Sequence, residues 1–181
     1  MKTLRDFAFY VEERIENSIL SKNTYVGVDN ILPNRGGIKP SDYVPTEGNS
    51  IKFQSGDILI GNIRPYFKKI WLATFEGGCS ADVLCIRPKK TKLSSCLFAT
   101  LSQDAFFEYD MAGSKGSKMP RGDKNHIMNF PISISENYEK IGRIILDFDA
   151  QIKRNNEMVQ KLQCFKPALN FSNNGGIRYA G

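Results

Sequence analysis

Residues 55–69 read Ser-Gly-Asp-Ile-Leu-Ile-Gly-Asn-Ile-Arg-Pro-Tyr-Phe-Lys-Lys and combine a turn, an apolar run and a cationic loop. Ser55-Gly56-Asp57 is typical of a turn, and Ile58–Ile60 is typical of a strand. An apolar run bounded by turns favours a strand packed in a core rather than one on a solvated sheet face. Working outward, similar patterns predict strands within residues 25–28, 70–75 and 82–86.

The first 130 or so residues predict a mixed α+β domain. Leu93–Tyr109 is rich in Leu, Phe and Ala and is long enough for one helix packed on the predicted sheet. Val11–Ile19 carries many charges and few apolar residues, so a short helix and an irregular segment are both open interpretations. Asp29–Asp42 contains Pro-Asn and Gly-Gly pairs and is predicted to be rich in turns.

The chain changes character after Phe130-Pro131-Ile132. Residues 138–166 contain no proline and a single glycine, Gly142. Their apolar residues recur at intervals of four, three, four, seven and three residues. That heptad spacing predicts one long helix with an apolar seam, about 40 Å long for about 28 residues. The predicted seam consists of Ile141, Ile145, Phe148, Ile152, Asn155, Val159 and Leu162.

A seam of this length must be buried against something, and two interpretations are open. The helix can fold back on its own domain as an ordinary amphipathic helix. Alternatively it pairs with another chain as a coiled coil, and a lone Asn at a seam position such as Asn155 can fix register and partner number. We favour pairing with a second copy. The predicted domain organisation is a recognition domain over 1–135, a dimerisation helix over 136–166 and a loose tail over 167–181.

Positive charge is concentrated in two parts of the sequence. The net charge is +6 overall, but residues 33–70 hold six Lys or Arg against three acids, and residues 111–130 hold four against one. This distribution is expected if both segments face a polyanion, although basic residues can also simply keep loops soluble. The candidate DNA contacts are Asn62, Arg64, Lys68 and Lys69 in the first segment and Ser114, Lys115, Ser117, Lys118, Arg121 and Lys124 in the second.

These residue types suit a nucleic acid. Lys and Arg neutralise phosphates, and Arg can also donate two hydrogen bonds to guanine O6 and N7. Glycines let the backbone approach the nucleic acid closely. Hydroxyl and amide groups can donate to phosphate oxygens. The opposing interpretation is two solvated surface loops, with Tyr66 or Phe67 contributing to the core.

The sequence offers no catalytic or metal signature. Nucleophile-elbow, phosphate-loop and zinc-protease motifs are missing, and Asp82 has no second acid placed to form a nuclease site. Cys79, Cys85, Cys96 and Cys164 lack metal-ligand or disulfide spacing. No apolar run approaches the length of a membrane span, and no signal peptide is apparent, so we expect a cytoplasmic protein. From the missing motifs we expect it to be non-catalytic and to need no cofactor or metal.

Five stretches in order resemble the specificity (S) subunits of Type I restriction-modification systems. Four resemble the target-recognition domain, and the fifth resembles the conserved helix that follows it. They are residues 25–37 (YVGVDNILPNRGG), 56–69 (GDILIGNIRPYFKK), 77–88 (GGCSADVLCIRP), 113–131 (GSKGSKMPRGDKNHIMNFP) and 138–162.

The resemblance implies sequence-specific binding of double-stranded DNA. In that family each recognition domain reads one half of a split target, and the paired helices set the gap and dock the modification (methyltransferase) subunits. Restriction subunits join through the assembled complex, in which catalysis belongs to the other subunits. Family members usually contain two recognition domains and two helices, whereas this chain has one of each. It therefore resembles a half-length S subunit, either a natural half that is expected to act as a homodimer or a truncated form of a longer subunit.

Two other classes of function are open, a protein-protein interaction module and an enzyme. The interaction module could be a scaffold that docks methyltransferase subunits through the helix without reading DNA. It could also be a DNA mimic, but a mimic would be strongly acidic, unlike this chain. A self-contained nuclease would require metal-dependent cleavage, which the missing acid cluster disfavours.

Overall fold

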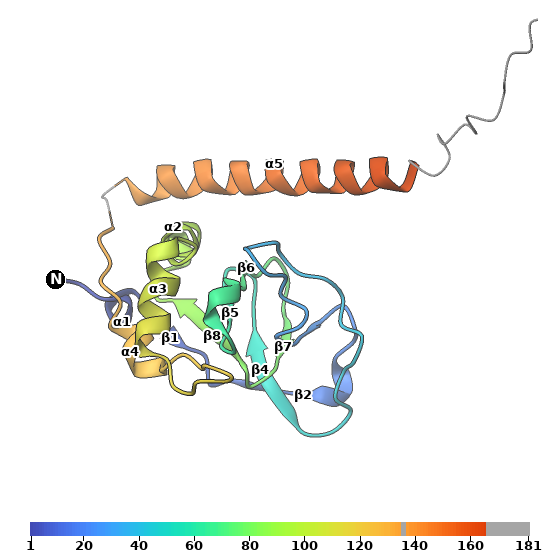
Figure 1. Cartoon of the computed structure of the whole chain (residues 1–181), viewed down its shortest axis with the longest axis horizontal. Helices are drawn as coiled ribbons and strands as arrows, with labels where there is room; N and C mark the ends of the chain where they lie inside the picture. The colour runs from blue at the N-terminus through green and yellow to red at the C-terminus, as the bar shows by residue number, and fades with distance from the viewer. Residues whose placement is uncertain (135–136, 166–181) are drawn as a thin grey trace, which may run out of the picture. The chain divides into compact units, whose positions relative to one another are not determined.

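The computed structural model describes residues 1–134 and 137–165 (Figure 1). One compact unit runs from Met1 to Ile145, and a second begins at Leu146. The first unit contains two four-stranded sheets rather than one. The first sheet has the order β1 (Ala8–Tyr10), β8 (Val83–Pro88), β5 (Ile58–Gly61), β6 (Ile70–Leu72), with antiparallel pairs throughout. The second has the order β2 (Arg14–Glu16), β4 (Asn49–Phe53), β7 (Gly77–Cys79), β3 (Tyr25–Val26), and its β3–β7 pair is parallel.

The alternating side chains of β5 explain how the layers stack. Ile58 and Ile60 belong to a core shared with the helices, whereas Leu59, on the opposite face, packs in a second core with Phe53 and Trp71. Both faces of the first sheet are therefore covered, one by helices and the other by the second sheet. The prediction that the apolar strands are buried in a core is confirmed, since every residue of β5 and β6 is buried.

Short helices complete the unit, and Figure 1 shows α1–α4 gathered on the side of the first sheet. The α-helices are α1 (Leu4–Phe7), α2 (Ser94–Leu101), α3 (Asp104–Gly113) and α4 (Lys124–Met128). Three single-turn 3₁₀ helices lie at η1 (Asn17–Ile19), η2 (Pro65–Phe67) and η3 (Thr91–Leu93).

The prediction of one helix over Leu93–Tyr109 is wrong, because the chain breaks between α2 and α3. Gln103 is extended, with φ −75° and ψ 153°, and it precedes the first turn of α3. Arg35 stabilises the break from a distant turn: its Nε donates to the Ser102 carbonyl and its Nη2 bonds the Asp104 carboxylate. Apolar content alone did not reveal this long-range partner.

Two segments with weak sequence patterns also form strands. Val11–Ile19 contains the strand β2 followed by the single-turn 3₁₀ helix η1, so neither one helix nor an irregular segment describes the whole stretch. Gly77-Gly78 lies inside β7, although glycine pairs usually mark a turn. A Cβ at Gly77 would collide with the Thr24 carbonyl, and one at Gly78 would lie 2.5 Å from Leu20 Cδ1. The close packing of these neighbouring segments of the chain therefore requires glycine in this strand.

The predicted long helix is present as α5 (Tyr138–Phe165). Its seam residues Phe148, Ile152, Val159 and Leu162 are each more than half exposed in the single chain. Ile141 is also exposed, and Ile145 is partly buried. Pairing of this seam as a coiled coil stays a prediction, as do the domain bounds given above, and the tail predicted over 167–181 lies outside the described residues. No described helix is both long and apolar enough to cross a membrane.

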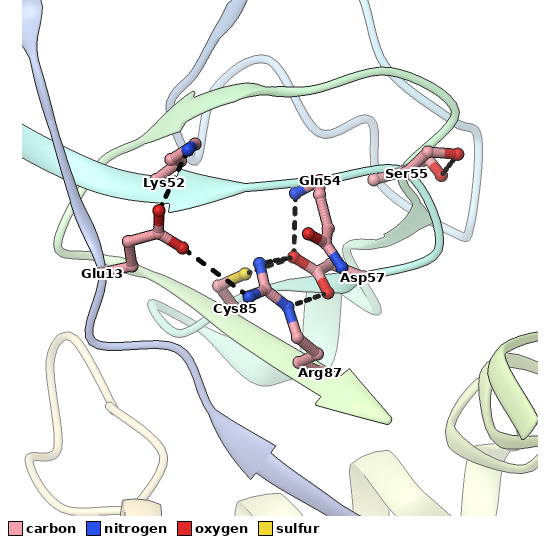
Figure 2. A network of polar contacts seen from close by, with 8 residues as sticks. Glu13, Lys52, Gln54, Ser55, Asp57, Cys85 and Arg87 are labelled. Atoms are coloured by element: carbon pink, nitrogen blue, oxygen red, sulfur yellow. Dashed lines mark hydrogen bonds and ion pairs between the residues drawn. The ribbon is translucent and has the colours of Figure 1, made fainter. Parts of the chain in front are cut away.

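A polar network joins the two sheets (Figure 2). Asp57, only 1% exposed in its side chain, accepts two hydrogen bonds of 2.8 Å from Arg87 of β8. It also accepts one of 2.9 Å from the Gln54 backbone N–H, directly after β4. Glu13 extends the network, since it lies 3.8 Å from Arg87 and 2.9 Å from Lys52 of β4. Hydrogen bonding to Asp57 raises the pKa of Arg87, so this arginine remains charged.

Replacement of Arg87 tests how much this network stabilises the fold. Arg87→Ala leaves the Asp57 carboxylate buried without a countercharge, so we expect a loss of about 3–5 kcal/mol in the free energy of unfolding at pH 7. Urea denaturation measures it. The control is Lys52→Ala, which breaks a more exposed ion pair and is expected to lose less than about 1 kcal/mol. Equal losses in the two variants would contradict the assigned role of Arg87.

Candidate nucleic-acid interface

Parts of the two cationic segments, separated by 43 residues in sequence, meet in the structure. We call residues 62–69 the first loop and residues 113–124 the second loop. The Arg64 N–H donates to the Pro120 carbonyl at 2.8 Å, and the Gly122 N–H donates to the Asn62 carbonyl at 3.3 Å. Ile63 and Arg121 pair between them as an antiparallel bridge. These backbone contacts, which we call the joint, bring both loops to one place on the molecule.

The first loop has an unusual backbone. Arg64 and Lys68, on either side of η2, adopt left-handed conformations with φ of 54° and 51°. Asn34 and Arg35 do the same in a facing turn, where their N–H groups donate to the carbonyls of Phe67 and Lys68 at 2.8 and 3.0 Å. A left-handed conformation costs a non-glycine residue about 1–2 kcal/mol, and such residues persist where surrounding contacts hold them. The two turns therefore fix each other's shape.

The predicted contacts of the first loop differ in accessibility. The Lys69 side chain is 13% exposed, and its Nζ donates to the Val28 carbonyl at 2.7 Å, which makes it a structural tie. Asn62 is buried, and its Oδ1 has no hydrogen-bond partner within the described part of the chain. Lys68 is partly exposed and forms a 2.8 Å ion pair with Asp104. Arg64 is also partly exposed.

The second loop presents its cations more openly. Lys115, Lys118, Arg121 and Lys124 are all exposed. Backbone N–H···O bonds of 2.9 Å in both directions between Lys115 and Arg121 fold the loop into a narrow hairpin. Ser117 is exposed, whereas the Ser114 hydroxyl donates to the Met111 carbonyl at 2.9 Å. Two of these cations have acidic neighbours, at 2.7 Å for Lys115–Asp123 and 3.1 Å for Arg121–Asp82. Exposed pairs of this kind contribute at most about 1 kcal/mol, so a phosphate can compete for the cation.

Asp123 fixes the end of the second loop. Its carboxylate caps α4 by accepting hydrogen bonds from the Asn125 and His126 N–H groups at 3.0 and 3.1 Å. The ion pair with Lys115 and these backbone bonds lower the pKa of Asp123 to about 2. The cap therefore stays charged and in place at neutral pH.

A buried carboxyl group lies at the joint. Asp110 of α3 is fully buried, and neither of its carboxyl oxygens has a hydrogen-bond partner within residues 1–134 and 137–165. A Cβ added at Gly122 would collide with Asp110 Oδ1 and would lie 2.9 Å from Asn62 Oδ1. Gly122 thus lets the second loop approach both side chains. Burial raises the pKa of Asp110 to about 6, against a smaller opposite effect of His126.

Sequence reasoning missed Asp110, Asp104, Arg35 and the partnership of Asp82 with Arg121. Asp110 had a usable signal, because it follows Phe106 and Phe107 by four and three residues and so shares their helix face. Both phenylalanines are buried. The partners of Arg35 and Asp82 depend on long-range folding and left no local pattern.

The described residues hold no group of three or more His, Cys, Asp or Glu able to bind a metal ion. Cys79, Cys85 and Cys96 are free and buried, while the Cys164 side chain lies outside the described residues. Hydrogen bonding to Cys79 and burial raise the pKa of the Cys85 thiol, which disfavours the reactive thiolate. His126 stacks on Tyr109 with ring centres 4.0 Å apart, and its Nε2 lies 2.9 Å from the Tyr109 carbonyl.

Replacing Asp110 tests the buried carboxyl group. A pKa raised from 3.8 to about 6 means that its stabilising contribution is complete below about pH 4 and is lost as the pH rises through 6. Asp110→Asn stays neutral, so we expect it to be more stable than the parent at pH 8 by up to about 3 kcal/mol, and to lose this advantage by pH 4.

Urea unfolding between pH 4 and pH 8 measures the difference between Asp110→Asn and the parent. Glu108→Gln, an exposed change on the same helix, is the matched control and is expected to show little difference. A pH-independent difference for Asp110→Asn would show that Asp110 is charged throughout this range.

No protein-family model matches the chain. The specificity subunit of the Escherichia coli Type I restriction enzyme EcoDI is 27% identical over 96 residues, which cover 51% of this chain and 21% of that protein. Among solved structures, the HsdS subunit from Thermoanaerobacter tengcongensis is 23% identical with a TM-score of 0.59, covering 90% of this chain and 44% of that one.

Two further solved structures share the fold. A chain from a structural study of assembly and conformational transition in the type I R-M system matches with a TM-score of 0.65 and 23% identity, covering 90% of this chain and 44% of that one. The Type I S subunit from M. genitalium matches with a TM-score of 0.58 and 13% identity, and the match covers 91% of this chain and 42% of that one. The chain thus spans less than half the length of each of these proteins.

Proposed function

Because the chain resembles Type I specificity subunits in sequence and in fold, we propose that it is a sequence-specific, non-catalytic DNA-recognition subunit of a Type I restriction-modification system. In this proposal it binds double-stranded DNA, reads one half of a bipartite target and docks modification subunits, and restriction subunits join through the assembled complex. The observation that carries the proposal is the joint, where the Arg64 N–H bonds the Pro120 carbonyl and unites two cationic loops.

The charges around the joint support binding to a duplex. Lys115, Lys118, Arg121 and Lys124 are exposed, and Arg64 and Lys68 from the first loop are partly exposed. Phosphate contacts supply most of the sequence-independent affinity of DNA-binding proteins, and they position the protein for base contacts. Lys69 and Asn62 contribute indirectly in this proposal, by holding the loop, because both side chains are largely buried.

Salt-dependent binding tests the proposed interface. Lys118→Ala removes one exposed cation, so we expect weaker binding to all duplex sequences and a slope of log K against log salt that is smaller by about 0.9. Fluorescence anisotropy with a labelled duplex at several salt concentrations measures both. Lys90→Ala, an exposed lysine outside both loops, is the control and is expected to leave the slope unchanged. If the parent chain shows no salt-dependent binding, the scaffold function replaces the proposed one.

The exposed seam of α5 supports pairing with a second copy. Apolar side chains at Phe148, Ile152, Val159 and Leu162 lie on one helix face and are exposed in the single chain. Two identical chains related by a two-fold axis would read the same half-site twice, in inverted orientation. The paired helices would then set the gap between the half-sites.

A charge in the seam tests the pairing. Ile152→Asp places a carboxylate in an interface that would otherwise be dry, so we expect a dimer to become a monomer in sedimentation equilibrium. Gln151→Asp adds the same charge at the neighbouring exposed position outside the seam and is expected to remain dimeric. A parent chain that is already monomeric at high micromolar concentration would exclude this pairing.

A further inference from the structure

A cavity of about 490 Å³ opens beside the joint. Ile63 and Arg64 of the first loop and Met119 of the second form part of its wall. The rest comes from β3 and the turn after it, from residues 41–43, and from Ser80 and Asp82 between β7 and β8. We call it the joint cavity. The contact between the two loops therefore also forms part of this hollow.

The cavity wall is acidic although the loops around it are basic. Its carboxylates are Asp29, Asp42 and Asp82. Each has a cation nearby: Lys69 lies 4.0 Å from Asp29, Lys39 lies 3.4 Å from Asp42, and Arg121 lies 3.1 Å from Asp82. Carboxylate acceptors of the wall therefore alternate with cationic donors that lie beside it, while the cation in the wall itself is Arg64.

This alternation does not suit phosphate contacts, because carboxylates repel phosphates. It suits the edges of base pairs in the major groove, which present donors beside acceptors. Adenine offers its N6 amino group beside N7, and a C·G pair offers the cytosine N4 amino group beside guanine O6. A carboxylate accepts from either amino group, and a neighbouring guanidinium donates to N7 or O6.

Asp82 is the carboxylate best held for such a contact. Its backbone carbonyl accepts from the Asn62 N–H at 2.9 Å, and its side chain pairs with Arg121 at 3.1 Å. Its main chain is thus held by the first loop, and its carboxylate lies beside a cation of the second. Its side chain is 42% exposed, whereas those of Asp29 and Asp42 extend almost fully into water. A partly desolvated, fixed acceptor discriminates among partners better than a mobile, hydrated one.

We propose that the joint cavity reads bases, with Asp82 accepting a hydrogen bond from the amino group of an adenine or cytosine and Arg121 donating to the adjacent acceptor. The remaining exposed cations of the second loop contact phosphates. This inference rests on the proposed function, and it assigns sequence preference to one pair of residues.

The test selects bound duplexes from a randomised pool, using the full-length chain and its variants, and then measures affinity for the selected and scrambled duplexes. Asp82→Asn keeps the shape of the side chain but replaces one acceptor oxygen with a donor. We expect it to change preference at a single base pair by about tenfold to a hundredfold. The salt slope and the affinity for scrambled DNA should stay close to those of the parent.

Two variants complete the design. Arg121→Lys keeps the charge but removes the two-pronged donor, so we expect it to relax preference at the same or the adjacent base pair. Glu108→Gln, an exposed change outside the wall of the joint cavity, is the control and should leave preference unchanged. An unchanged urea midpoint for each variant establishes that it is folded.

The outcomes separate this inference from the function on which it rests. If Asp82→Asn tightens binding to every duplex alike and leaves the preference unchanged, Asp82 only repels phosphates and the inference is wrong, while the proposed function stands. If the parent chain binds all duplexes without preference, or binds none, both proposals fail together.

Discussion

Two backbone hydrogen bonds, Arg64 N–H to the Pro120 carbonyl and Gly122 N–H to the Asn62 carbonyl, are the constraint on which the proposed interface depends. They hold two loops that are distant in sequence against each other. Because they use main-chain groups, they fix the loops without occupying the cationic side chains. Gly122 is required for this approach, since any Cβ there would collide with Asp110.

The layers behind the joint anchor both of its loops. The first loop continues directly from β5, whose residues are buried on both faces. The second loop leaves α3, which packs against η2, and it ends on the Asp123 cap of α4. The Asp57–Arg87 network ties the first sheet to the second and so fixes the base of the β4–β5 turn. Both loops are therefore anchored at each end by buried structure, as a binding surface with fixed geometry requires.

Local patterns predicted the elements that have strong local signals. The runs Ile58–Ile60 and Ile70–Leu72 form strands as expected, because continuous apolar stretches between turns have few other stable solutions. The heptad spacing after Tyr138 correctly predicted α5. The split between α2 and α3 was not predictable, since Arg35 stabilises it from nearly seventy residues away. Strand β7 was also missed, because glycine usually signals a turn and here serves close packing.

The sequence by itself determined the α+β class, the long helix with its apolar seam and the concentration of positive charge in two segments. These properties follow from the order and spacing of side chains along the chain. Only the tertiary structure decided which cations remain accessible, that Lys69 and Asn62 are largely buried, and that Asp82 lies between the two loops. Such relations depend on contacts between residues far apart in sequence, and the free energy of those contacts comes from the packing of the whole domain.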